Sequence, residues 1–183
     1  TGTENIMMAA CLAKGKTTLR NVAMEPEVSD LADFLNLMGA KIKGAGSELI
    51  EIEGVECLNS TKYTIPADRI EAGTYLVAAA ATGGEIKINS IQPERLNNVI
   101  ERLKLAGALI EVNTNSISLN MNNKRPLPVD ISTSPFPGFP TDMQAQFSVL
   151  NALADGESIV EENVFENRFM HVQELNRMGC NIS

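Results

Sequence analysis

Three segments of this chain repeat one pattern, and an internal repeat constrains the fold more than any other sequence feature does. In each copy a helix-like apolar run ends at a glycine that opens a short strand rich in β-branched residues and ending in asparagine. The three strands lie in residues 14–21, 83–89 and 155–163, and their glycines Gly15, Gly84 and Gly156 are about 70 residues apart. We therefore expect copies of one folding unit.

A second landmark recurs where an amphipathic helix stops at a glycine in each copy. These glycines are Gly39, Gly107 and Gly179, again about 70 residues apart. In the first two copies, apolar residues at 31, 34, 35 and 38 and at 96, 99, 100 and 103 follow the spacing of a half-buried helix. A glycine directly after such a helix is a typical C-cap.

Two short strands follow the capping glycine in the first two copies. Residues 40–43 and 49–55 flank the turn at 44–46, and residues 109–112 and 116–119 flank the turn at 113–115. Both pairs predict β-hairpins. Each copy thus reads helix, strand, helix, strand, strand, and a strand before the first helix would complete a βαβαββ unit of an α/β fold.

The repeat also predicts that the chain is truncated at both ends. The first copy begins directly on its first helix, and the third stops at residues 181–183, inside its first hairpin strand. Unpaired strand edges and uncovered helix faces favour marginal stability or association between copies.

Composition excludes several classes of partner. The formal net charge is −8 and the chain has no compensating basic stripe, so nucleic acid and anionic membranes are not expected partners. The apolar runs are too short to span a bilayer. Neither a disulfide framework nor a zinc site is supported by the three cysteines, Cys11, Cys57 and Cys180, and the single His171. We expect no cofactor. A reducing cytoplasm fits this cysteine usage, with the cysteines and Met143, Met170 and Met178 packed in the core.

Residues 122–140 interrupt the repeat with five prolines, which favour neither helix nor central strand. Directly after them, Thr141 and Gln144 match a capping box, which places Asp142 in the first turn of a helix. A carboxylate there faces the positive end of the helix dipole. Asp142 is then either a structural helix-terminus carboxylate or a general base for a substrate hydroxyl.

The third copy departs from the others between its first strand and its second helix. The first two copies use a proline near the helix start, whereas residues 163–171 read NVFENRFMH. Where one copy departs from a pattern that the other copies share, function is expected. The structural alternative is a surface loop with Arg168 solvated and Phe165 and Phe169 in the core, and His171 is expected to be a hydrogen-bonded structural histidine.

Four stretches together resemble one family. They are TGTENIMMAA (1–10), PADRIEAGT (66–74), FPTDMQAQF (139–147) and VFENRFMHV (164–172). These resemble the UDP-N-acetylglucosamine enolpyruvyl transferases over the whole chain. The resemblance implies an inside-out α/β barrel of two domains, each with three such units and with helix N-termini directed at an interdomain cleft. Residues 1–66 would be the last unit of the first domain, and 67–183 one full and one truncated unit of the second.

The resemblance implies a reaction and its site residues. The 3-hydroxyl of UDP-N-acetylglucosamine would add to C2 of phosphoenolpyruvate, followed by protonation of C3 and loss of phosphate, the first committed step of peptidoglycan synthesis. Asp142 matches the aspartate assigned as base, Val164 matches a backbone contact to the sugar nucleotide, and Phe165 would pack against it. Thr141 belongs to the same substrate-binding motif, and Arg168 would lie near the reacting phosphate region.

The family's protonating residue is a cysteine or aspartate on a Gly-rich loop that no position of this chain matches. A Lys-Asn pair and most of the arginines that bind phosphoenolpyruvate are likewise unmatched. We therefore expect the 183 residues alone to be inactive. Two alternatives remain open. One is the shikimate-pathway enolpyruvyl transferase, and the other is a non-catalytic repeat scaffold that binds an anionic ligand.

Overall fold

The computed structural model describes all residues, 1–183, and they form two compact units. Unit 1 holds Thr1–Pro66 together with Pro135–Pro137, and unit 2 holds Ala67–Ser134 and Gly138–Ser183. None of the helices has both the length and the apolar character that a membrane span requires.

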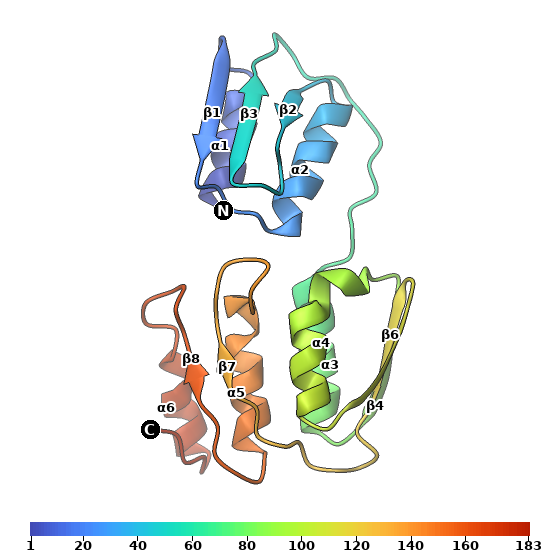
Figure 1. The fold of residues 1–183 in the computed structure, drawn as a ribbon, viewed down its shortest axis with the longest axis vertical. Helices are drawn as coiled ribbons and strands as arrows, with labels where there is room; N and C mark the ends of the chain where they lie inside the picture. Colours follow the sequence, from blue (N-terminus) through green and yellow to red (C-terminus); the bar gives the residue numbers. More distant parts are fainter. The chain divides into compact units, whose positions relative to one another are not determined.

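Unit 1 is a three-stranded antiparallel sheet backed by two helices (Figure 1). Its elements are α1 (Gly2–Ala10), β1 (Lys16–Arg20), α2 (Pro26–Leu37), β2 (Lys41–Lys43) and β3 (Leu49–Glu53). The sheet order is β1-β3-β2. Ile42, Ile50 and Ile52 point from the sheet into a core shared with Val28 and Leu35 of α2. Alternation along the strands therefore separates a buried face from a charged one.

Unit 2 begins with the same arrangement. Its first elements are α3 (Arg69–Ala81), β4 (Glu85–Asn89), the 3-10 helix η1 (Pro93–Leu96), α4 (Asn97–Leu105), β5 (Leu109–Asn113) and β6 (Ser116–Asn120). The sheet order β4-β6-β5 and its antiparallel pairing reproduce those of unit 1. The repeat and both hairpins predicted from the sequence are confirmed.

Unit 2 continues into a third copy. Its elements are β7 (Ile131–Ser132), the 3-10 helix η2 (Thr141–Met143), α5 (Gln144–Ala152), β8 (Val160–Glu161) and α6 (Met170–Arg177). β7 and β8 pair in parallel, with Ile131 opposite Val160 and Ser132 opposite Glu161. β7 is the strand expected before the first helix of a unit, and it lies inside the proline-rich segment. That segment therefore contains a short strand as well as loop.

The three capping glycines adopt the same backbone conformation. Gly39, Gly107 and Gly179 have φ values of 101°, 96° and 99°. Side chains with a Cβ rarely adopt this conformation, so the predicted C-caps are confirmed.

Two asparagines extend the repeat beyond what the sequence pattern indicated. Asn36 brackets Ile42, donating to its carbonyl at 3.0 Å and accepting from its amide at 2.8 Å. Asn176 brackets Ile182 in the same way, at 2.9 and 3.0 Å. The chain after α6 thus leaves its helix as the chain after α2 does, although residues 181–183 form no strand here.

Core assignments differ from the sequence-based expectation at several positions. Met143 is fully buried, as expected, but Met170 and Met178 are 79% and 81% exposed. Cys11 is buried, whereas Cys57 is exposed and Cys180 half-buried, and all three are free thiols. The physical reason at Met170 and Met178 is that α6 has no buried residue and is not covered by a sheet as α2 and α4 are. The fold class is mixed α/β, and the 183 residues do not close into a barrel.

Candidate functional site

The predicted site residues gather beyond the carboxyl ends of the parallel strands β7 and β8. Asn163 fixes this edge, because its side chain donates to the Ser132 hydroxyl at 2.9 Å and its backbone amide donates to the Thr133 hydroxyl at 2.8 Å. Parallel strands deliver their following residues to one edge of a sheet, where α/β proteins commonly bind ligands. Glu162 and the loop 163–169 follow β8 at this edge.

Thr141 and Asp142 lie in the 3-10 turn η2 that leads into α5. Pro140 precedes this turn with φ −69° and ψ 130°, and Asp142 occupies the first turn as expected. The predicted capping box is wrong, because neither η2 nor α5 has a side-chain cap. The helix begins as a tighter turn, so Gln144 points into the core, fully buried, instead of reaching back. The Thr141 hydroxyl instead donates to Glu162 Oε2 at 2.8 Å.

Val164 and Phe165 are positioned by the same glutamate. Their backbone amides donate to Glu162 Oε1 at 2.9 and 3.0 Å. Glu162 therefore joins three of the predicted residues and was missed by sequence reasoning. The available signal was its place, since it is the carboxylate directly before the loop at which the third copy departs from the repeat.

The charged form of Glu162 is stabilised in the fold. Partial burial disfavours ionisation, but hydrogen bonds from the Phe165 amide, the Thr141 hydroxyl, the Val164 amide and the Thr133 hydroxyl outweigh it. Together they hold the pKa of Glu162 below its ordinary value. A carboxylate that accepts several hydrogen bonds is a strong anchor for the segments that donate them.

Asp142 and Arg168, the remaining two predicted residues, pair with each other. The Arg168 Nη2 donates to Asp142 Oδ1 at 2.6 Å, and its guanidinium carbon lies 5.2 Å from the centroid of the Phe165 ring. Asn167 precedes it with φ 56°, a conformation that asparagine tolerates better than most residues. Arg168 is therefore paired and stacked, which differs from the solvated arginine of the structural alternative.

All five predicted residues and Glu162 thus form one connected group. The site is open, since the Asp142 side chain is 56% exposed and Phe165 is 57% exposed. Phe169 is 40% exposed, so neither phenylalanine of the loop is in the core. A solvent-facing carboxylate beside a guanidinium and an exposed ring can accept a proton from a hydroxyl, attract an anion and pack against a sugar.

His171 does not behave as expected. Its Nε2 is buried without a hydrogen-bond partner, and its ring lies 6.4 Å from that of Phe169. The expected hydrogen bond at this atom is therefore not made in the 183 residues. No group of three or more potential ligands is arranged to hold a metal ion.

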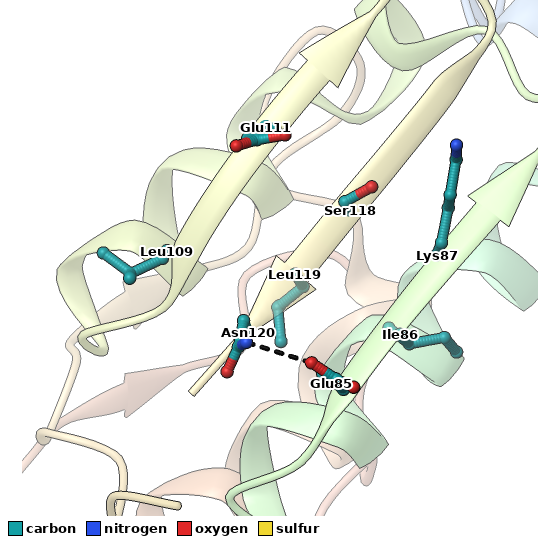
Figure 2. Close-up of a pocket in the computed structure, with 8 residues that line it drawn as sticks. All are labelled: Glu85, Ile86, Lys87, Leu109, Glu111, Ser118, Leu119 and Asn120. Carbon is teal, nitrogen blue, oxygen red and sulfur yellow. Dashed lines mark hydrogen bonds between the residues drawn. The ribbon is translucent and has the colours of Figure 1, made fainter. Parts of the chain in front are cut away.

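A separate groove of about 540 Å³ lies on the sheet of β4, β5 and β6 (Figure 2). Its lining is Glu85, Ile86, Lys87, Leu109, Glu111, Ser118, Leu119 and Asn120. Asn120 donates to Glu85 at 3.0 Å across it. None of the predicted site residues lines this groove.

Comparisons with known proteins cover the whole chain. Residues 1–183 match the family model described as EPSP synthase (3-phosphoshikimate 1-carboxyvinyltransferase). A UDP-N-acetylglucosamine 1-carboxyvinyltransferase of Hydrogenovibrio crunogenus (strain DSM 25203 / XCL-2) is 58% identical over 182 residues, which is 100% of this chain and 44% of the relative. The chain therefore spans less than half the length of that curated relative.

Solved structures share the fold. The crystal structure of the enolpyruvyl transferase NikO from Streptomyces tendae matches with a TM-score of 0.85 at 25% identity, over 99% of this chain and 43% of that one. An EPSP synthase structure from Acinetobacter baumannii matches with a TM-score of 0.60 at 21% identity, over 95% of this chain and 41% of that one.

Proposed function

Because the chain belongs to the EPSP synthase family of carboxyvinyltransferases, we propose that the full-length protein carrying it transfers an enolpyruvyl group from phosphoenolpyruvate to UDP-N-acetylglucosamine. The 58% identical relative carries that activity in its name. The observation that carries the proposal is the Asp142–Arg168 pair, which sets a carboxylate beside a cation in an open site. The product would enter peptidoglycan synthesis.

The reaction needs a base and an acid. The 3-hydroxyl of the sugar adds to C2 of phosphoenolpyruvate while its proton leaves, and C3 gains a proton. The resulting tetrahedral intermediate then loses a proton from C3 and phosphate from C2, which restores the double bond between these carbons. Asp142 is the base in this proposal. Arg168 engages its Oδ1, so its Oδ2 is the oxygen that accepts the hydroxyl proton.

Substrate contacts follow from the same geometry. The Val164 amide is committed to Glu162, so the backbone atom that it offers a ligand is the carbonyl oxygen, which accepts from a sugar hydroxyl or amide. The exposed Phe165 ring packs against the sugar nucleotide. Arg168, which is partly exposed, meets the phosphate side of the reaction.

The inside-out barrel is part of this proposal. Two identically ordered sheets, each backed by helices, and a third copy with parallel β7 and β8 support a barrel built from βαβαββ units. Residues 1–66 are then the last unit of the first domain, and 67–183 belong to the second. The reaction is placed in the cytoplasm, which suits three free cysteines.

The test is a substrate comparison with the full-length protein. Phosphate release is measured with phosphoenolpyruvate and either UDP-N-acetylglucosamine or 3-phosphoshikimate. Release with the sugar nucleotide alone supports the proposal. Release with the shikimate substrate alone assigns the protein to the sister activity, and release with neither favours the non-catalytic scaffold that binds an anionic ligand.

A further inference from the structure

We propose that Glu162 is a positioning residue of this site: its carboxylate holds the Thr141–Asp142 turn against the Val164–Phe165 loop. This inference rests on the proposed function. Nothing in the sequence pattern or in the comparisons assigns Glu162 a role. It acts through its neighbours, because both of its oxygens accept hydrogen bonds from protein groups.

The two carboxylate oxygens of Glu162 serve different segments. Oε2 accepts from the Thr141 hydroxyl, 21 residues away in sequence, and Oε1 accepts from the Val164 and Phe165 amides in its own loop. One carboxylate therefore fixes the distance between the turn that carries Asp142 and the loop that presents the Val164 carbonyl. Those are the two elements proposed to hold the same sugar.

A second link between these segments is the Asp142–Arg168 ion pair. Both of its side chains are partly exposed, Asp142 at 56% and Arg168 at 33%, and exposed ion pairs contribute little to stability. A substrate that approaches Asp142 also competes directly with Arg168 for the carboxylate. The link through Glu162 is not subject to that competition, so it maintains the geometry while Asp142 exchanges partners.

The loop is anchored behind Glu162 as well. The Asn163 side chain donates to the Ser132 hydroxyl, and its backbone amide donates to the Thr133 hydroxyl. These two hydrogen bonds hold the start of the loop in place against the end of β7. Glu162 thus lies between this strand edge and the residues proposed to contact the substrates. The lowered pKa of its carboxyl agrees with a permanently charged anchor.

The test uses the full-length enzyme with Glu162→Ala, Glu162→Gln and Glu162→Asp. Glu162→Ala removes both acceptor oxygens and the hydrogen bonds made to them, and we expect turnover to fall by up to about 100-fold, with a higher KM for the sugar nucleotide. Glu162→Gln keeps Oε1 for the two amides, and its amide nitrogen can donate to Thr141, so activity should return to within a few-fold of the wild type. Glu162→Asp keeps the charge but is one methylene shorter, and should be worse than glutamine.

Thr141→Val and a double-mutant cycle complete the design. If Thr141 and Glu162 act as one link, Thr141→Val should add little to the loss caused by Glu162→Ala. Glu161→Ala is the matched control, because Glu161 is the adjacent exposed carboxylate on β8 and lies outside this set of hydrogen bonds. Turnover numbers are calculated per folded enzyme, and the amount of folded enzyme is measured from the amplitude of the thermal transition.

Each outcome decides the inference. The inference is supported if activity decreases from the wild type to Glu162→Gln and then to Glu162→Asp and Glu162→Ala, while Glu161→Ala is unaffected. Unchanged kinetic constants in Glu162→Ala, or an aspartate variant more active than the glutamine variant, overturns it while leaving the proposed function intact. If Glu162→Ala does not fold, the Gln, Asp and Thr141→Val comparison decides alone. A wild-type enzyme without phosphate release overturns the proposed function and this inference with it.

Discussion

The guanidinium of Arg168 donates to the carboxylate of Asp142 across 2.6 Å, between two segments 26 residues apart in the chain. One residue lies in the turn before α5 and the other in the loop before α6. The pair brings a candidate base and a candidate phosphate ligand into contact. It also ties the proposed chemistry to two separate elements of the third copy.

Replacing Asp142 by asparagine should abolish most of the turnover of the full-length enzyme. The amide cannot accept the hydroxyl proton, and loss of a general base costs about 10² to 10⁴ in rate. Stability should change by less than about 1 kcal/mol, because the ion pair is exposed and Asp142 caps no helix by a side-chain bond. Steady-state phosphate release and thermal melting measure the two effects. Full turnover in Asp142→Asn would end the assignment of the base.

Replacing Arg168 separates the roles of charge and shape. Arg168→Lys keeps the charge but loses the planar guanidinium that both bonds Asp142 and stacks over Phe165. Arg168→Ala loses both, and should lower kcat/KM by about 10- to 100-fold, the range expected for a hydrogen bond to a charged group. The lysine variant should fall between alanine and wild type in steady-state assays.

Arg177 offers the matched control for this comparison. It forms a similarly short ion pair with Glu174, at 2.6 Å, on the exposed surface of α6. Arg177→Ala should leave kcat/KM unchanged within about two-fold, as expected for a surface ion pair. Equal losses in the Arg168 and Arg177 variants would indicate a general effect of charge and not a role at the site.

Much of the fold follows from sequence because its signals are local and are repeated. The glycines at 39, 107 and 179 and the apolar spacing of α2 and α4 report backbone conformation directly, and independent copies agree. The exposure of Met170 and Met178 could not be predicted in this way. It depends on what covers α6, which is a long-range property that no local pattern encodes.

The structure brings the five residues named from the sequence together, but the sequence indicated neither Glu162 nor the hydrogen bonds that connect the group. The resemblance indicates both Asp142 and Arg168; the helix start after the proline-rich segment also points to Asp142, and the departure of the third copy from the repeat to Arg168. The capping box failed because the helix begins as a 3-10 turn with Pro140 at its N-cap, and the Thr141 hydroxyl donates to Glu162, a residue distant in sequence. A side chain able to bond its own backbone or a remote carboxylate gives the same local pattern in both cases.

Acid should weaken the site through Glu162. Its pKa is lowered in the fold, so its ionised form stabilises the folded state above the ordinary glutamate pKa, and this contribution is lost as pH falls through the folded pKa. Glu162→Gln has no such titration, so the difference in melting temperature between wild type and variant should shrink on acidification. Melting curves recorded from neutral to acidic pH test this. A difference that grows on acidification would contradict it.

The 183 residues alone should release no phosphate from the two substrates. Asp142 is the proposed base, but no residue of this chain matches the family's protonating loop, and an addition reaction without its acid stalls at the protonation of C3. The assay compares the isolated chain with the full-length protein at equal concentration. Phosphate release by the isolated chain would show that the acid lies within these residues.

The isolated chain should also self-associate through α6. This helix has no buried residue; Met170 at its start follows the partly exposed Phe169, and Met178 at its C-cap is also exposed. Large apolar side chains exposed along one uncovered helix favour association. Light scattering after size exclusion should therefore report species larger than a monomer, and the double change Met170→Gln with Met178→Gln should reduce them.

Met8→Gln is the matched control, because Met8 is an exposed methionine on α1 with 44% of its surface accessible. This change should leave the distribution of species unchanged. A wild-type chain that is monomeric and melts cooperatively would contradict the prediction, because the exposed face of α6 would then require no cover.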